Sequence, residues 1–166
     1  ENVLKPSSQD QCMKFSEVFH IIEQNVLRYI EASGKTISIT FDYAEDFLTD
    51  RHYTIVSLLD NLIMNAIEAC GESGNIRIIQ SRAGQNYLLQ VTDDGIGINP
   101  EELPFLFNPG YSTKFSPETG KMSTGLGLSH VENLSEALGG KVNVFSVRGE
   151  GANFVVTVPR NKLLCS

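Results

Sequence analysis

The sequence predicts an α/β two-layer sandwich, in which a mixed sheet of about five strands is covered on one face by three helices. Three long segments carry apolar residues at helical spacing, and five shorter segments carry the apolar patterns typical of strands. Nothing divides the composition of the 166 residues into two halves, so we expect one domain with a sizeable core.

The composition is that of a globular protein, with 41% apolar residues and a net charge of -7. No apolar run approaches the ~20 residues that cross a bilayer, and no secretory leader is present, so we expect no membrane contact. The negative charge is a poor match to nucleic acid. Because the chain begins with Glu1 rather than Met, we expect a piece of a longer protein.

The three cysteines, Cys12, Cys70 and Cys165, are widely scattered and odd in number. They show no metal-binding spacing, and they indicate a reducing compartment. We expect Cys70 to be a small core residue.

The first elements are a linker, a helix and a strand. Residues 1–14 are polar and aperiodic, which indicates a linker or a frayed end. A helical face begins at Phe15, and Gly34 ends the helix. Alternating apolar residues predict a half-buried strand at 36–41. The further apolar members of the helical face are Val18, Phe19, Ile22, Val26, Tyr29 and Ile30.

A longer helix is expected at about 51–70, with Thr49 or Asp50 as its cap. Asn61 and Asn65 lie four residues apart, so both side chains should occupy one face of this helix. Asn is a mediocre helix former, and two in the middle of a helix require a reason. They are either a solvated edge or partners of a polar ligand, since an Asn oxygen is a good ligand for magnesium.

Two strands at 75–82 and 85–92 deliver the chain to Asp93. An acid at the end of a buried strand can point into a cavity, where its carboxylate could accept a hydrogen bond from an amino group such as that of adenine. Gly95 and Gly97 let the backbone turn sharply and approach a flat ligand. The alternative for this Asp-x-Gly-x-Gly pattern is an ordinary turn.

A lid is expected after this motif. Residues 100–103 predict a single helical turn with Asn99 as its cap. Residues 108–122 contain prolines, glycines and Lys114. A loop of ~15 residues without internal structure is often a lid or a binding loop, and we expect it to be mobile.

Residues 123–128 open a third helix that continues to about Leu138 and is ended by Gly139. Small residues at a helix start leave backbone N–H groups for phosphate oxygens, although an ordinary helix start is the alternative. Two last strands are expected at 141–147 and 153–159.

Taken in order, these segments resemble the catalytic ATP-binding domain of sensor histidine kinases, in the superfamily that includes gyrase, the Hsp90 chaperones and MutL. The resemblance covers residues 15–160, leaves 161–166 as a C-terminal tail, and implies a Bergerat-type sandwich with a mobile ATP lid. Four motifs carry it: an asparagine box at 61–66, a first glycine box at 93–98, a phenylalanine box at 107–114 and a second glycine box at 124–128.

The resemblance implies a role for each matching residue. Asn65 would coordinate the magnesium that bridges the ATP phosphates, with Asn61 in the same pocket, and Asp93 would bind the adenine amino group. Lys114 is a candidate for the terminal phosphate, and a solvated lid lysine is the alternative. Asn61, Asn65 and Lys114 are therefore the implied catalytic residues. The other residues implied to bind ATP are Gly95, Gly97, Ile98, Phe107, Thr124, Gly125, Leu126, Gly127 and Leu128.

Asn61 also distinguishes subclasses. ATP-hydrolysing relatives carry there a glutamate that activates water, whereas an amide cannot take a proton. The site is therefore expected to hold ATP for transfer to a protein histidine, by positioning and charge neutralisation. The alternatives are an ATPase resembling gyrase, Hsp90 or MutL and a serine kinase of the anti-sigma type.

The chain departs from the family's pattern at three places. Glu68 stands where the kinases often carry a basic residue, which resembles the sensors of citrate, dicarboxylates, nitrogen or glutamine and removes one expected phosphate contact. Ser123 replaces the usual first glycine of the second glycine box. Ala152 and Asn153 replace the usual threonine, so an adenine-side water contact is expected to be lost.

None of the three histidines matches the phospho-accepting pattern. His20 precedes Ile21 and lies on the apolar face of the first helix, so we expect it in the core, while His52 and His130 suit surface or packing roles. The acceptor is therefore expected on a dimerisation domain absent from this chain, with a response regulator served indirectly. We expect a cytoplasmic domain that binds ATP but shows little autophosphorylation alone, whether its parent kinase is cytosolic or anchored in the membrane.

Overall fold

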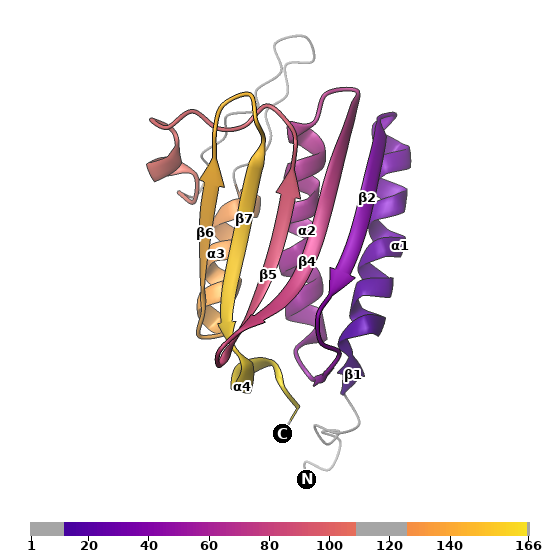
Figure 1. The fold of residues 1–166 in the computed structure, drawn as a ribbon, viewed down its shortest axis with the longest axis vertical. Coiled ribbons are helices and arrows are strands. Elements are labelled where there is room, and N and C mark those ends of the chain that lie inside the picture. Colours follow the sequence, from indigo (N-terminus) through magenta and orange to yellow (C-terminus); the bar gives the residue numbers. More distant parts are fainter. Residues whose placement is uncertain (1–11, 109–125, 166) are drawn as a thin grey trace.

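The structure is a computed structural model that describes residues 12–108 and 126–165. Its centre is a five-stranded mixed sheet in the order β2-β4-β5-β7-β6. Figure 1 shows three helices packed on one face of this sheet, which confirms the predicted two-layer sandwich. The strands are β2 (Thr36–Tyr43), β4 (Ser73–Ala83), β5 (Asn86–Asp93), β6 (Lys141–Ser146) and β7 (Ala152–Pro159), and the helices are α1 (Phe15–Ser33), α2 (His52–Ala69) and α3 (Leu126–Ala137).

The strand pairing places one end of β5 at the centre of the sheet. β2 runs parallel to β4, with α2 as the crossover between them, and the other neighbouring strands are antiparallel. Asp93, the last residue of β5, pairs with Ile76 of β4 on one side and with Ala152 of β7 on the other. A residue in this position is held by backbone hydrogen bonds on both flanks, which fixes the direction of its side chain.

The core forms where the helical faces meet the inward side of the sheet. In α1 the buried residues recur at helical spacing, as predicted, and Gly34 ends the helix in a left-handed conformation with φ of 73°. The strands alternate between buried and partly exposed residues, with Tyr87, Leu89 and Val91 of β5 on the buried side. The buried residues of α1 are Phe15, Val18, Phe19, Ile22 and Val26.

The helix boundaries differ from the prediction in two places. α2 begins at His52, so the cap position belongs to Arg51 and not to Thr49 or Asp50. Thr49 accepts a hydrogen bond from the Arg51 N–H at 3.0 Å, just before the helix. The predicted turn at 100–103 is present, since Glu102 donates its N–H to the Asn99 carbonyl at 2.9 Å and Leu103 to the Pro100 carbonyl at 3.3 Å, and it continues into a short 3-10 helix at Leu103–Phe105, where Pro104 suits the first turn.

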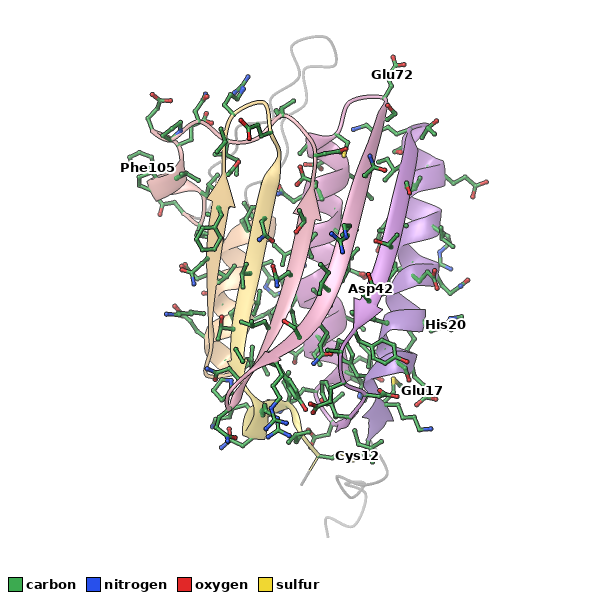
Figure 2. All side chains as sticks on the ribbon, in the orientation of Figure 1. Cys12, Glu17, His20, Asp42, Glu72 and Phe105 are labelled. Carbon is green, nitrogen blue, oxygen red and sulfur yellow. A yellow bond between two sulfur atoms is a disulfide. The ribbon has the colours of Figure 1, made fainter. Side chains whose placement is uncertain are left out.

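The expectation that His20 lies in the core is wrong. His20 is exposed, and Figure 2 shows it on the outer side of α1. Two residues correspond to about 200° of rotation along a helix, so His20 points away from the sheet when Ile22 points toward it.

Within the described residues, none of the helices is both long and apolar enough to cross a membrane.

The two ends of the described chain meet on a short strand that the sequence did not predict. β1 (Met13–Lys14) pairs with β3 (Leu48–Thr49), and Thr49 also forms a bridge with Leu164. A one-turn helix, α4 (Arg160–Leu163), follows β7 and buries Leu163 completely. Residues 160–165 therefore pack against the domain.

Cys12 and Cys165 form a disulfide across this meeting point, with their Cα atoms 6.2 Å apart. The sequence analysis left all three cysteines unpaired, because a separation of 153 residues hides the proximity that the fold creates. Cys70 is free and 4% exposed, as expected of a small core residue.

Candidate nucleotide-binding site

A cavity opens beyond the end of β5, between α2, α3 and the segment that follows β5. It brings together six residues that the sequence analysis singled out, namely Asn65, Asp93, Gly97, Ile98, Leu128 and Ala152. Three further residues complete its wall, namely Ala69, Ile96 and Leu106.

Asp93 supplies the buried carboxylate of this cavity. Its side chain is 4% exposed, and its Oδ1 accepts the backbone N–H of Gly95 at 2.8 Å. Because Asp93 is the last paired residue of β5, the strand holds its backbone while the turn amide orients its carboxylate. The carboxylate is thus an anchored acceptor for a polar group on a bound ligand.

The two glycines of the motif stand where the backbone is clamped between other elements. A Cβ on Gly95 would collide with the carbonyl oxygen of Ala69 at the end of α2. Gly97 has φ of 73°, and a Cβ there would collide with the carbonyl oxygen of Val147. Ile96 lies between them and donates its N–H to the Ala69 carbonyl at 3.1 Å. The two glycines therefore let this segment lie directly against the end of α2 and the turn between β6 and β7.

The turn between β6 and β7 supports the same segment from the other side. Ser146 accepts the Ile98 N–H at 2.9 Å and donates its hydroxyl to the Gly151 carbonyl at 2.7 Å. The Gly149 N–H donates to the Ile96 carbonyl at 2.6 Å. One serine thereby joins the first glycine box to the terminal hairpin.

The acid next to Asp93 has a different function. Asp94 is exposed and accepts two hydrogen bonds from Asn75, one from its backbone N–H and one from its Nδ2, both at 2.8 Å. These bonds lower the pKa of Asp94. Asp94 therefore fixes the loop to β4, whereas Asp93 lines the cavity.

Asn61 and Asn65 lie on one face of α2, as their spacing predicts, but they reach different surroundings. Asn65 lines the cavity. Asn61 donates its Nδ2 to the carbonyl of Ser57 at 2.7 Å, and its Oδ1 faces Gly127 in the first turn of α3. Ser57 in turn contacts His130 of α3 across 3.3 Å. Asn61 is therefore part of the contact between α2 and α3, beside the cavity.

The remaining predicted residues divide into four groups. Leu128 is 9% exposed and lines the cavity, whereas Phe107 packs against Phe154 of β7 with ring centroids 6.5 Å apart and is not among the lining residues. Leu126 begins α3. Of the predicted lid at 108–122, every residue after Asn108, including Lys114, lies outside the described part of the chain, as do Ser123, Thr124 and Gly125.

Sequence reasoning missed two apolar residues of the wall in particular, Ala69 and Leu106. Ala69 is in the last turn of α2, and Leu106, which is 4% exposed, follows the 3-10 helix. Ala152, which the sequence analysis named, stands opposite Asp93 and is 7% exposed, so its methyl group occupies the place where the resemblance implies a threonine. Apolar walls around one buried polar group are typical of a site for a flat ring.

A metal ion in this cavity would depend on few protein ligands. Within residues 12–108 and 126–165, no cluster of three or more His, Cys, Asp or Glu residues could hold one. Asn65 offers an amide oxygen, which suits a hard cation such as magnesium.

Cys70 lies behind the site, where burial and then the charges of Asp93 and Asp94 raise its pKa, so it stays a thiol at neutral pH.

Comparison with known proteins shows which family and which proteins this chain resembles. Residues 49–162 match the family model described as histidine kinase-, DNA gyrase B- and HSP90-like ATPase. The chain is 37% identical over 107 residues to the sensor histidine kinase ZraS of Escherichia coli, covering 64% of this chain and 22% of ZraS. It is 28% identical over 153 residues to the sensor histidine kinase GlnK of Bacillus subtilis, covering 92% of this chain and 37% of GlnK. The chain thus spans well under half the length of these relatives.

Solved structures show the same architecture. The catalytic domain of histidine kinase ThkA, in a nucleotide-free form, superposes with a TM-score of 0.72 at 25% identity, covering 90% of this chain and 97% of that domain. The mycobacterial sensor histidine kinase MprB, at 19% identity, shares the fold with a TM-score of 0.71 and covers 93% of this chain.

Proposed function

Because this chain belongs to the family of histidine kinase-, DNA gyrase B- and HSP90-like ATPases, we propose that its cavity binds Mg-ATP and that the domain donates the γ-phosphate to a histidine of a dimerisation domain. Within the family it matches the ATP-binding catalytic domains of sensor histidine kinases. The observation that carries the proposal is the meeting of Asn65 and Asp93, which lie on different elements, in one cavity.

Asp93 is the proposed adenine anchor. Its carboxylate is buried, oriented by the Gly95 N–H and surrounded by apolar side chains, so an amino group would gain a hydrogen bond in a place where water is displaced. Ile96, Ile98 and Leu128 would contact the two faces or the edge of the ring. Specificity for adenine then follows from one acceptor in an apolar slot.

Asn65 is the proposed magnesium ligand, and the phosphates would extend from it toward the first turn of α3. The ion, when bound, would neutralise phosphate charge. Gly127 belongs to that turn, where backbone N–H groups and the helix dipole favour an anion. The implied contacts of Lys114, Thr124 and Gly125 complete this part of the proposal.

Asn61 supports transfer to a protein over hydrolysis. Its amide is fixed by the bond to the Ser57 carbonyl, and an amide has no proton-accepting capacity for activating water. An ATPase resembling gyrase or Hsp90 would need a carboxylate at this position. A serine kinase of the anti-sigma type remains the second candidate, because the same cavity could serve a hydroxyl acceptor.

The acceptor histidine, the response regulator and the location belong to the same proposal. His20 is exposed but is followed by Ile21, so it lacks the acidic neighbour of an acceptor, and the acceptor is placed on a separate helical domain. We assign this domain to the cytoplasm, with a membrane anchor, if any, elsewhere in the parent kinase. Glu68 of α2 stands where the kinases often carry a basic residue, and this resemblance supports a sensor of the citrate, dicarboxylate, nitrogen or glutamine type.

Calorimetric titration with a non-hydrolysable ATP analogue tests the site. Asp93→Ala should abolish binding, and Asn65→Ala should bind equally with and without magnesium. Asp94→Ala is the matched control, because that carboxylate is adjacent but bonded to Asn75 and should leave affinity within about 3-fold. Failure of the unaltered protein to bind at millimolar nucleotide would overturn the proposal.

The chemistry is tested by the product formed. With Mg-ATP and the dimerisation domain of the same kinase, acid-labile phosphohistidine is expected on the partner. Acid-stable phosphoserine would instead support the serine kinase, and release of free phosphate without protein labelling would support an ATPase.

A further inference from the structure

The two cysteines at opposite ends of the chain are brought together by contacts that do not involve sulfur. Met13, next to Cys12, pairs with Thr49 in β3, and Lys14 pairs with Leu48. From the other end, Leu164 forms a bridge with Thr49, and the Cys165 N–H donates to the Leu48 carbonyl at 2.9 Å. β3 is therefore a common template on which both ends align.

The template is itself anchored in the core. Thr49 is fully buried. Leu163 of α4, which directly precedes the bridge partner Leu164, is also fully buried. The Cα atoms of the two cysteines lie 6.2 Å apart, within the usual range of about 4.4–6.8 Å for a disulfide. Both residues are half-buried, so small thiols and disulfides can reach them, whereas Cys70 is enclosed.

We propose that Cys12 and Cys165 form a reversible thiol–disulfide modification site that reacts with low-molecular-weight disulfides such as oxidised glutathione. The thiolate of one cysteine attacks the small disulfide and releases one small thiol, leaving a mixed disulfide. The thiolate of the other cysteine then attacks the protein sulfur of that mixed disulfide and releases the second small thiol. Two protein thiols are oxidised, and one small disulfide is reduced to two thiols.

Reversibility rests on the cytoplasmic location that the proposed function includes. Disulfides in that compartment are usually transient or redox-sensing, because thiols are kept reduced there. The pair would then be open in resting cells and would close when the pool of oxidised small thiols rises. Since the contacts on β3 already align the ends, closing the bond requires little rearrangement of the fold.

The modification acts at the end of the molecule opposite the cavity. Figure 1 shows β1 and α4 at the lower end of the sheet, while β5 runs to the upper end that carries Asp93, and Figure 2 labels Cys12 at that lower end. The closed bond fixes the point at which residues 1–11 join the domain. It should therefore change the stability of the fold while leaving nucleotide affinity unchanged.

The experiment equilibrates the 166-residue protein in glutathione buffers from fully reduced to fully oxidised and measures free thiols, intact mass and melting temperature. Unaltered protein and Cys70→Ser should lose two thiols and two hydrogens on oxidation and should melt higher by roughly 5 °C or more. Cys12→Ser and Cys165→Ser should form no intramolecular bond and should show no such rise.

Two results would overturn the proposal. Three free thiols in fully oxidised buffer would show that the pair does not form, and a bond that survives excess reduced glutathione would make it a permanent crosslink. Titration of the ATP analogue into both forms separates this site from the proposed function: equal affinities are expected. Loss of binding in both forms would sink the ATP assignment alone, and an affinity that differs more than about 3-fold would contradict the independence of the two ends.

Discussion

The side-chain oxygen of Asn61 lies 3.3 Å from the position that a Cβ on Gly127 would occupy. This distance is tighter than most contacts of a methyl group, so a side chain at residue 127 would require Asn61 to move by a few tenths of an ångström. The same oxygen belongs to an amide whose nitrogen is already bonded to the Ser57 carbonyl. Gly127 therefore lets α3 begin close to the asparagine face of α2.

Gly127→Ala should weaken ATP binding by about 3- to 10-fold, because Asn61 must leave its preferred rotamer at a cost of about 0.5–1.5 kcal/mol. Stability should not fall, since Ala is the better helix former. Calorimetric titration and thermal melting measure the two effects. Gly71→Ala is the control, because no described atom lies within 4 Å of its Cβ position. Equal affinities for both variants would contradict the prediction.

Gly149 and Gly151 separate the cost of a dihedral angle from that of a close approach. Both have positive φ, 89° and 92°, but only at Gly151 would a Cβ collide with the carbonyl oxygen of Asp93. Gly149→Ala should cost about 1–2 kcal/mol of unfolding free energy, and Gly151→Ala should cost more than that and also abolish nucleotide binding. Urea denaturation of the pair provides the comparison, and similar losses would show that the collision is relieved by movement of the turn.

Lys35 closes the end of α2. Its Nζ donates to the carbonyl oxygens of Ile67 and Cys70, both at 2.8 Å, at the C-terminal end of the helix, where the helix dipole favours a positive charge. Lys35→Met should lower the free energy of unfolding by about 1–2 kcal/mol, measured by urea denaturation. Lys141→Met, at an exposed position in β6, serves as the control and should change it by less than about 0.5 kcal/mol. A loss no greater than that of the control would mean that solvent satisfies both carbonyls.

Asp60 is expected to destabilise the protein at neutral pH. Burial between α1 and α2 raises its pKa, and although Asn25 donates to its Oδ2 at 3.3 Å, its Oδ1 is buried with no hydrogen-bond partner among the described residues. A raised pKa means that the folded state binds the proton more tightly than the unfolded state. The cost of ionisation is therefore present above the folded pKa and disappears below the ordinary value of 3.8.

Asp60→Asn should consequently raise the melting temperature at pH 7, by a few degrees at most because the group is only half-buried. The advantage over the unaltered protein should shrink as the pH falls toward 4. Melting curves from pH 7 to pH 4 measure it, with Asp42→Asn on the exposed side of β2 as the control. A difference that stays constant with pH would show that the carboxyl is not responsible.

Local pattern was sufficient to predict the helices and the five sheet strands to within a few residues, because burial of a periodic face decides each of them. The buried stripe of α1 and the positive φ of Gly34 both follow from the sequence alone. The order of the four boxes was also sufficient to place Asn65 and Asp93 together. His20 was misplaced because successive residues of a helix point about 100° apart, so the residue next to a buried one can already lie on the exposed side.

What could not be predicted are contacts between segments that are distant in sequence. The alignment of Cys12 with Cys165 depends on β3, a two-residue strand without a pattern of its own. The bonds of Lys35 and the positions of the wall residues Ala69 and Leu106 arise only when the fold brings α2, the residues before β2 and the 3-10 helix together. No local signal marks such residues, since an apolar side chain in a cavity wall has the same composition as one in the core.

The position of β7 between β5 and β6 has a consequence for synthesis of the protein. β5 is complete at residue 93, but its outer edge is paired only by β7, whose last residue is 159. On the ribosome, the edge of β5 therefore stays open while some sixty further residues are made, and Asp93 has no partner strand on that side. An open apolar edge is prone to pair with other chains. A translational pause between residues 93 and 159 should thus favour aggregation of the nascent domain more than a pause after it.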